Sequence, residues 1–440
     1  MLIEFSVENF RSIKEEQTLS LIKDSPNEMP ENYFDPKTPN VPELLNSAVL
    51  YGANASGKSN LFKAMDCMRA IVEGSFNKKV GSELPIEPFI FNSLTETQPT
   101  TFNINFIVFL KIDESSEEKP VRVEYGFSAD KNIIFEEWLS VYPKGREQSW
   151  FHRQYNEETQ NYDWSNESPF FKGKKSVWKQ NTRSDQLFLS TAVQLNSEQL
   201  KPIYEWFSKK LRIVGRDRID NFLTIKMCEH NQGLKKIIIS LLNQADIDVD
   251  DIDLRDSEFD FDSLPKDLPE SIKNKIKEDL KDRKEAYFIH KNELGKPKSL
   301  PLDEESDGTQ KIFEFSSLIF VALSEGSPLI IDELNKSLHP DLVRFLIRIF
   351  NSEINEKHAQ LIITTHETSA LRKDLLRRAQ IWFCEKQADK STRLYPLIDF
   401  NPHKTREDIE ESYLSGRYGG KPILKKFVLV DELKKVLFED

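Results

Sequence analysis

The chain has 440 residues, of which 38% are hydrophobic and 30% are charged, and its formal net charge is −12. This balance is typical of a globular protein with a sizeable core, and the acidic charge argues against a protein that coats nucleic acid, since that task needs dense Lys and Arg. The three cysteines form no C-x-x-C pair, which argues against zinc fingers, zinc hooks and thioredoxin-like redox motifs. No apolar run approaches the roughly 18–20 residues of a membrane helix, and the early acidic Glu4 argues against a signal peptide, so we expect a cytoplasmic protein.

The N-terminal part of the chain shows a strand–loop–strand–helix pattern. Residues 2–7 and 49–51 predict two short strands, and the Pro- and Asn-containing stretch 24–42 between them predicts an extended loop. The second strand ends on Gly52, and apolar residues at helical spacing predict a helix over 60–72.

Alternating apolar residues mark the next part of the chain as sheet. Residues 101–110, 121–127 and 133–141 predict three strands of an antiparallel sheet, and 187–190 is expected to form a further strand. We expect residues 1–190 to form the N-terminal part of a nucleotide-binding domain.

Helical patterns dominate the middle of the chain, over 198–210, 233–242 and 269–284. The acidic stretch 246–262 is expected to be a solvated linker rather than a metal site. No heptad repeat is sustained there, which argues against a long coiled coil. We therefore expect a mainly helical lobe over 191–295, inserted into the nucleotide-binding domain.

The remaining residues, 296–440, are expected to complete that domain. Strand and helix patterns alternate here, at 312–324, 328–331, 338–350, 360–364 and 380–383. Such alternation predicts a parallel sheet. The expected fold class is α/β, with a mixed sheet and an inserted, largely helical lobe.

The strongest motif is a complete phosphate-binding loop between the strand at 49–51 and the helix at 60–72. Gly52-Ala-Asn-Ala-Ser-Gly57-Lys58-Ser59 matches G-x-x-x-x-G-K-[ST] in full. Glycines let backbone N–H groups close around phosphates, and the start of the helix adds a favourable dipole. Lys58 would reach the β- and γ-phosphates and Ser59 would bind Mg²⁺, so the motif predicts ATP and Mg²⁺ as ligands.

Two carboxylates follow the apolar strand at 328–331. Asp332 would hold the magnesium ion through water, and Glu333 would be the general base that activates the attacking water. One helix later, the strand at 360–364 leads to His366, which we interpret as a sensor of the γ-phosphate.

A fourth motif precedes the apolar helix at 312–324. Ser306 and Gly308 stand where that helix begins, and such a start can bind an anion. The position of these residues ahead of the Asp332-Glu333 pair is where ABC proteins carry their signature sequence.

In this order the motifs resemble the ABC ATPases of the RecF, structural-maintenance-of-chromosomes and overcoming-lysogenization-defect group. The opening Asn9-Phe10-Arg11-Ser12 is similar to the "NFRS" of that group, whose arginine lies near the nucleotide. The resemblance therefore implies Arg11, and also Asn54 and Asn60 in and after the phosphate loop, as nucleotide-binding residues. It requires a Q-loop glutamine as well, for which Gln186 and Gln194 both remain candidates.

Segments 304–310, 335–340 and 413–419 are similar to bacterial abortive-infection ATPases of the RloA/AbiL type. This resemblance implies a dimer that sandwiches ATP, with Ser306 and Gly308 of one subunit facing the nucleotide on Lys58 of the other. Ser337 and His339 would form the D-loop that crosses between the two sites. It also implies anti-phage defence together with a separate effector protein, such as a nuclease or toxin.

The main hypothesis is thus a homodimeric or larger ABC-type ATPase that senses infection and regulates an effector. The signature, Glu305-Ser-Asp-Gly-Thr in place of Leu-Ser-Gly-Gly-Gln, favours slow turnover. One alternative is a DNA-repair ATPase that acts on DNA ends, and another is an ATP-bound scaffold that inhibits a toxic nuclease with little turnover. Nucleic acid remains an open partner, and no membrane partner is expected.

Overall fold

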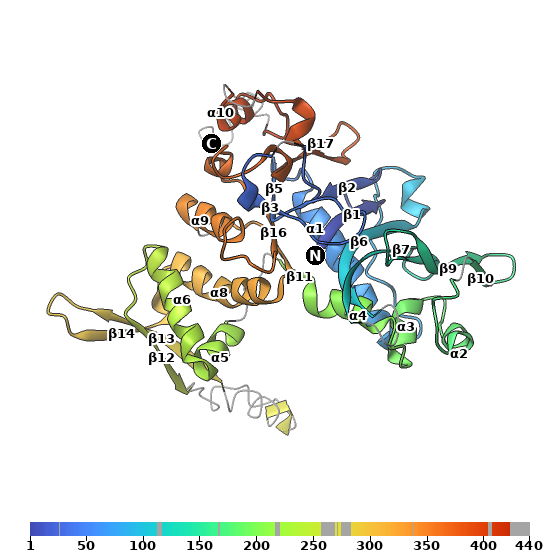
Figure 1. Ribbon diagram of the computed structural model, residues 1–440, viewed down its shortest axis with the longest axis horizontal. Coiled ribbons are helices and arrows are strands. Elements are labelled where there is room, and N and C mark those ends of the chain that lie inside the picture. The colour runs from blue at the N-terminus through green and yellow to red at the C-terminus, as the bar shows by residue number, and fades with distance from the viewer. Residues whose placement is uncertain are drawn as a thin grey trace, which may run out of the picture.

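The computed structural model describes residues 1–25, 27–111, 117–165, 168–215, 221–256, 269–270, 272–273, 283–336, 338–403 and 407–422. Two large sheets dominate this part of the chain (Figure 1). No helix among the described residues is long and apolar enough to span a membrane.

A six-stranded sheet forms the centre of the region that is expected to bind nucleotide. Its strand order is β11-β15-β16-β5-β17-β18, where neighbours are parallel except for the last pair. The strands are β5 (Ser47–Gly52), β11 (Arg212–Val214), β15 (Pro328–Ile331), β16 (Gln360–Thr364), β17 (Ile381–Lys386) and β18 (Thr392–Pro396). Every residue of β5, β15 and β16 is buried, as central parallel strands require. The predicted parallel sheet is thus confirmed, and the carboxyl ends of these three strands share one edge.

Helices cover both faces of this sheet. Helix α1 (Lys58–Gly74) packs with Leu50 and Ile362 on one face, and α8 (Asp307–Glu325) and α9 (Pro340–Phe350) pack with Val49 and Ile363 on the other. Because neighbouring residues of a strand face opposite sides, these pairs place α1 on one side and α8 and α9 on the opposite side.

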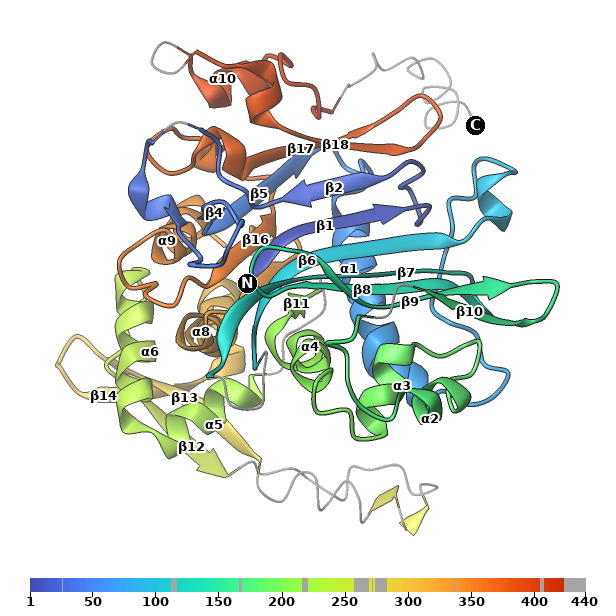
Figure 2. The same cartoon turned by 45° about the vertical axis from the view of Figure 1, so that its right-hand side comes forward.

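An antiparallel sheet lies against the other side of α1 (Figure 2). Its order is β10-β9-β8-β7-β6-β1-β2. The strands are β1 (Leu2–Glu8), β2 (Gln17–Ser20), β6 (Thr100–Leu110), β7 (Lys119–Ala129), β8 (Ile134–Tyr142), β9 (Gln148–Asn156) and β10 (Asn161–Ser165). The three predicted strands of this sheet are confirmed, as is the strand at the N-terminus.

The predicted strand at 187–190 is wrong, because these residues begin helix α3 (Phe188–Gln194). The carboxylate of Glu137 in β8 accepts hydrogen bonds from the backbone N–H groups of Phe188 at 2.7 Å and Leu189 at 3.0 Å. A helix start leaves such N–H groups without partners inside the helix, so this distant carboxylate caps α3. The short helices α2 (Lys175–Gln180) and α4 (Lys201–Glu205) flank it, and α4 continues into the π-helical turn Trp206–Lys210.

The middle of the chain contains the predicted helix at 233–242, as α6 (Gln232–Gln244), and a helix that the sequence patterns did not predict, α5 (Phe222–His230). Both helices pack against α8. They are accompanied by an antiparallel sheet that the sequence patterns did not predict, with β12 (Asp251–Asp256), β13 (Lys284–Lys291) and β14 (Pro297–Pro301). These elements form the lobe at the lower left of Figure 1. The acidic stretch therefore contains a strand, while most of the predicted helix at 269–284 lies outside the described residues. Strand β11 pairs with β15 and so joins the central sheet.

Smaller elements complete the described chain. A two-stranded sheet of β3 (Tyr33–Phe34) and β4 (Leu44–Leu45) lies within or next to the expected loop, and α10 (Ile409–Leu414) lies near the end. Short 3-10 helices occur at Pro30–Asn32, Ser75–Asn77, Thr95–Thr97, Leu302–Glu304, Thr368–Ala370, Arg378–Gln380 and Leu397–Phe400.

Candidate nucleotide-binding site

The predicted phosphate loop runs from the end of β5 to the first residue of α1. Lys58 is only 6% exposed, and its Nζ donates to the carbonyl oxygens of Gly52 at 2.7 Å and Ala53 at 3.2 Å. The lysine is therefore curled over the loop that is predicted to bind phosphates. Gly57 has φ +102°, and a Cβ there would lie 1.9 Å from Thr392 Oγ1, so both its backbone angle and its surroundings require glycine. Asn54 stands exposed on the loop.

A chain of hydrogen bonds fastens this loop to two other parts of the molecule. Asn60 Nδ2 donates to Ser12 Oγ at 2.7 Å, and Ser12 Oγ lies 2.8 Å from Thr392 Oγ1. Thr392 Oγ1 in turn donates to Ser56 O at 2.9 Å, so Ser12 must donate to Thr392. The sequence pointed to Asn60 but not to Ser12 or Thr392, because 380 residues separate those two hydroxyl groups.

The two predicted metal-binding residues meet at the carboxyl edge of the sheet. Ser59 Oγ donates to Asp332 Oδ1 at 3.1 Å, across 273 residues of sequence. Asp332 is 8% exposed, and Thr364 Oγ1 donates to the same Oδ1 at 2.6 Å. Carboxylate and hydroxyl oxygens are the ligands that Mg²⁺ prefers, so this donor set fits the predicted ion.

Glu333 and His366 follow strands β15 and β16 at the same edge. Glu333 has φ +55°, and its N–H donates to Thr364 Oγ1 at 2.7 Å. The backbone N–H of the exposed His366 donates to Asn335 Oδ1 at 3.1 Å, and Thr365 Oγ1 donates to the same oxygen at 3.1 Å. Asn335 thus ties the turn after Glu333 to the residues around His366.

Arg11 is held by Glu87. Its guanidinium lies 2.6 Å from Glu87 Oε1, and its backbone N–H donates to Glu87 O at 2.7 Å. The adjacent Ser12 is joined to the phosphate loop through Asn60, which brings Arg11 near that loop, while its guanidinium pairs with Glu87. A direct contact between Arg11 and nucleotide stays a prediction.

The predicted signature residues, and His339 of the predicted D-loop, lie at helix starts. Ser306 caps α8, since its Oγ accepts from Thr309 N at 3.1 Å, and it is exposed, while Gly308 is half-buried in the first turn. His339 caps α9 through Nδ1, which accepts from Asp341 N at 3.2 Å. Ser337 lies outside the described residues.

The two Q-loop candidates differ in their surroundings. Gln186 is 2% exposed, and its side chain donates to Phe76 O at 2.8 Å and accepts from Arg183 N. Its amide thus joins the segment before α3 to the 3-10 turn that follows α1. Gln194 is exposed at the last residue of α3.

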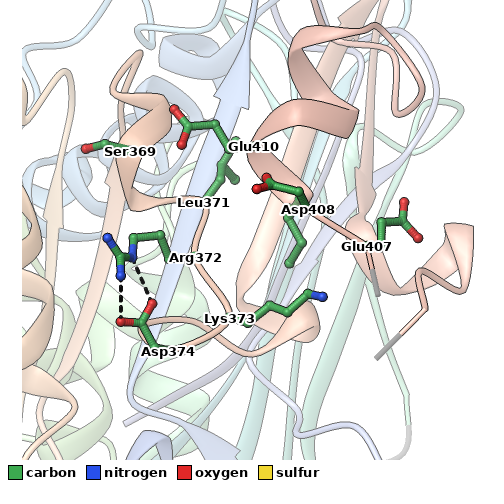
Figure 3. A pocket seen from close by; sticks show the side chains of 9 residues that line it. Ser369, Leu371, Arg372, Lys373, Asp374, Glu407, Asp408 and Glu410 are labelled. Atoms are coloured by element: carbon green, nitrogen blue, oxygen red, sulfur yellow. Dashed lines mark hydrogen bonds and ion pairs between the residues drawn. The ribbon is translucent and has the colours of Figure 1, made fainter. Parts of the chain in front are cut away.

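A hollow of about 590 Å³ opens between the segment after His366 and helix α10 (Figure 3). Arg372 and Asp374 form a bidentate pair on one side of it, at 2.8 Å and 3.0 Å. Carboxylates from Glu407, Asp408 and Glu410 lie on the other side. The lining carries both signs of charge and selects neither an anion nor a cation.

Burial raises the pKa of Cys384 to about 12, although the nearby charge of Lys58 lowers it. The three cysteines are buried. The thiol beside the phosphate loop therefore stays protonated near neutral pH and offers no nucleophile.

The solved structures that resemble the chain at low identity include two SMC heads. One is an SMC head domain from Thermotoga maritima, with 12% identity, a TM-score of 0.38, and coverage of 90% of this chain and 98% of that chain. The other is an SMC head bound to the C-winged helix domain of ScpA, with 11% identity, a TM-score of 0.36, and coverage of 90% and 97%. No curated protein matches the sequence.

Residues 47–372 match the model of the family described as "AAA domain, putative AbiEii toxin, Type IV TA system". The matched stretch includes the phosphate loop, the Asp332-Glu333 pair and His366. Because it spans well over half of the chain, the protein belongs to this family of AAA-domain proteins.

Proposed function

We propose that the chain is a Mg²⁺-dependent ATPase that closes as a dimer around ATP and regulates an effector protein in anti-phage defence. The observation that carries the ATPase assignment is the contact of Ser59 with Asp332. It brings the end of the phosphate loop and the carboxylate-bearing strand together at one edge of the sheet, where nucleotide binds in open α/β folds.

Each predicted residue has a role in this proposal. Lys58 would neutralise the β- and γ-phosphates, and Ser59 and Asp332 would hold the magnesium ion. When bound, that ion withdraws charge from the phosphate oxygens. Glu333 accepts a proton from the attacking water, and His366 donates a hydrogen bond to the γ-phosphate.

The exposure of Ser306 and His339 supports the dimer. Their helix starts are open to a second subunit, so Ser306 and Gly308 would face the partner's nucleotide, with Ser337 and His339 at the crossing between the sites. The departure of the signature from Leu-Ser-Gly-Gly-Gln supports slow hydrolysis.

The defence role draws support from the family description, which names a toxin. We propose that the lobe within 191–295 receives the effector or the trigger, while 1–190 and 296–440 build the ATPase domain. The pairing of β11 with β15 supports counting residues 212–214 with the ATPase domain rather than with the lobe.

The experiment that tests this proposal compares ATP hydrolysis by the wild type and by Glu333→Gln, with and without added DNA ends, and measures molecular mass with and without ATP. We expect hydrolysis by the wild type, its loss in the variant, and ATP-dependent dimers in both. Glu353→Gln, an exposed residue just after α9, is the matched control and should hydrolyse ATP like the wild type. Normal hydrolysis by Glu333→Gln would refute the assigned base. Stimulation of hydrolysis by DNA ends would favour the hypothesis of a DNA-repair ATPase. An oligomer whose mass does not depend on ATP would favour the hypothesis of a scaffold that inhibits a nuclease.

A further inference from the structure

Thr364 stands at the last position of β16, between the strand that carries Asp332 and the strand that leads into the phosphate loop. Thr364 is 0% exposed. Its hydroxyl donates to Asp332 Oδ1 at 2.6 Å and accepts from the Glu333 N–H at 2.7 Å. A hydroxyl has one proton to donate, so the proton of Thr364 is committed to the aspartate.

The backbone at Glu333 needs such support. Its φ of +55° is a left-handed conformation that costs a residue with a Cβ roughly 1–2 kcal/mol. Thr364 accepts two hydrogen bonds that hold this turn. Its hydroxyl oxygen accepts from the Glu333 N–H, and its carbonyl oxygen accepts from the Leu334 N–H at 3.1 Å. The direction of the Glu333 side chain therefore depends on the end of β16.

The same hydroxyl determines how the aspartate faces the phosphate loop. Asp332 Oδ1 accepts from both Thr364 and Ser59, at 2.6 Å and 3.1 Å, so its carboxylate is oriented from two sides. Without the Thr364 hydroxyl, the Asp332 carboxylate loses the shorter of these two hydrogen bonds and keeps the longer one, from Ser59. It then gains rotational freedom.

We propose that Thr364 is a positioning residue for hydrolysis, whose single hydroxyl aligns the metal-binding Asp332 and the base Glu333 with each other. The inference rests on the proposed ATPase function. A threonine that only stabilises the strand would affect folding, whereas a positioning threonine affects Mg²⁺ use and turnover while ATP binding without metal is unchanged.

The test compares Thr364→Val, which keeps the shape and loses the hydroxyl, with Thr364→Ser, which keeps the hydroxyl. Thr224→Val is the matched control, because Thr224 lies in the lobe helix α5, is equally buried, and donates its hydroxyl proton to Phe313 O of α8. Hydrolysis is measured against Mg²⁺ concentration, and binding of a fluorescent ATP analogue is measured in EDTA and in Mg²⁺. Thermal unfolding is followed in parallel.

We expect Thr364→Val to lower kcat on the order of 10–100-fold, since misplacement of about 1 Å can cost about 100-fold. It should also raise the Mg²⁺ concentration needed for half-maximal binding or activity, while analogue binding in EDTA stays within about twofold of the wild type. Thr364→Ser should restore most of both properties, and Thr224→Val should leave them unchanged. If Thr364→Val does not fold, Thr364→Ala serves as the hydroxyl-free variant.

The inference would be overturned if the hydroxyl-free variant had the kcat and the Mg²⁺ dependence of the wild type. It would also be overturned if Thr364→Ser were as impaired as Thr364→Val. If hydrolysis is lost in Glu333→Gln but intact in Thr364→Val, this inference fails and the proposed function stands. If the wild type does not hydrolyse ATP, the proposed function fails, and the Mg²⁺ dependence of analogue binding still decides the role of Thr364. A wild type whose analogue binding ignores Mg²⁺ would overturn both.

Discussion

His290 Nε2 lies 2.6 Å from Glu305 Oε1, which joins strand β13 of the lobe to the residue just before Ser306. The other ring nitrogen, Nδ1, lies 2.7 Å from the carbonyl oxygen of Asp248. Both neighbours accept hydrogen bonds, so the pair of contacts favours the doubly protonated ring. Burial lowers the pKa of His290, but the bonds to Glu305 and Asp248 outweigh it, and the pKa is raised above its ordinary value.

The first prediction is that this contact stabilises the protein at low pH. A raised folded pKa means that the stabilisation is fully present below the unfolded value of about 6.5 and is lost as the pH rises through the folded pKa. The difference in the midpoint of thermal unfolding between the wild type and His290→Gln should therefore be largest below pH 6.5. This difference should shrink as the pH rises.

The matched control is His358→Gln, because burial lowers the pKa of His358, which stacks on Phe34. For His358 the pH trend is opposite. Its contribution to stability is present above about pH 6.5 and is lost as the pH falls through the lowered pKa. The same pH trend in both pairs of proteins would show that His290 does not act through Glu305.

The second prediction concerns Gly57. Alanine there would combine left-handed strain with a Cβ placed 1.9 Å from Thr392 Oγ1 and 2.8 Å from Ser12 Oγ. We expect Gly57→Ala to weaken ATP binding at least about tenfold, or about 1.4 kcal/mol, because the phosphate loop must shift. Gly81→Ala is the control, since Gly81 has φ +83° but no heavy atom within 4 Å of a Cβ. Equal binding by the two variants, measured with a fluorescent ATP analogue, would contradict this account.

Sequence patterns predicted those parts of the fold in which the signal is local. The phosphate loop is one run from Gly52 to Ser59, and β15 and β16 are short apolar runs that are buried throughout. Helix α3 was missed because its cap is Glu137, which lies 51 residues before Phe188 in the sequence. Strand propensity at 187–190 was overridden by that tertiary contact.

The site shows the same division between local and distant signals. Ser59 and Asp332 could be paired in advance, because each belongs to a motif with a known order. Thr364 and Asn335 could not, since their roles depend on the register of β15 against β16. The only signal in the sequence is a hydroxyl or amide residue close to each strand end, and many strands end in this way.

The third prediction concerns the buried ion pair between Glu137 and Arg153, both of whose side chains are 0% exposed, with Nη2 2.8 Å from Oε2. Glu137 also accepts from Tyr125 and caps α3. Replacing Glu137 with Gln leaves the arginine charge buried without its counter-charge, which should lower the free energy of unfolding by about 3–5 kcal/mol. Denaturant unfolding measures this loss.

The control for that pair is on the surface. Arg372 and Asp374 are 52% and 54% exposed, so Arg372→Gln should change the free energy of unfolding by only about 0–1 kcal/mol. If Glu137→Gln lowered the free energy of unfolding by no more than this, the buried pair would not stabilise the packing of the antiparallel sheet against α3.

The last prediction is that Asn335 holds His366 in place for hydrolysis. Its Oδ1 accepts both from the His366 N–H and from the Thr365 hydroxyl, so Asn335→Ala removes an acceptor that fixes two neighbouring residues. We expect kcat to fall about tenfold or more with little change in ATP affinity, because the hydrogen bond from the histidine to the γ-phosphate would strengthen in the transition state. Asn335→Asp keeps an acceptor but adds charge beside the phosphates, so it should weaken ATP binding instead. Asn181→Ala, at the exposed end of α2, should match the wild type. Steady-state kinetics separates these outcomes, and an unchanged kcat in Asn335→Ala would show that β16 holds the histidine without this side chain.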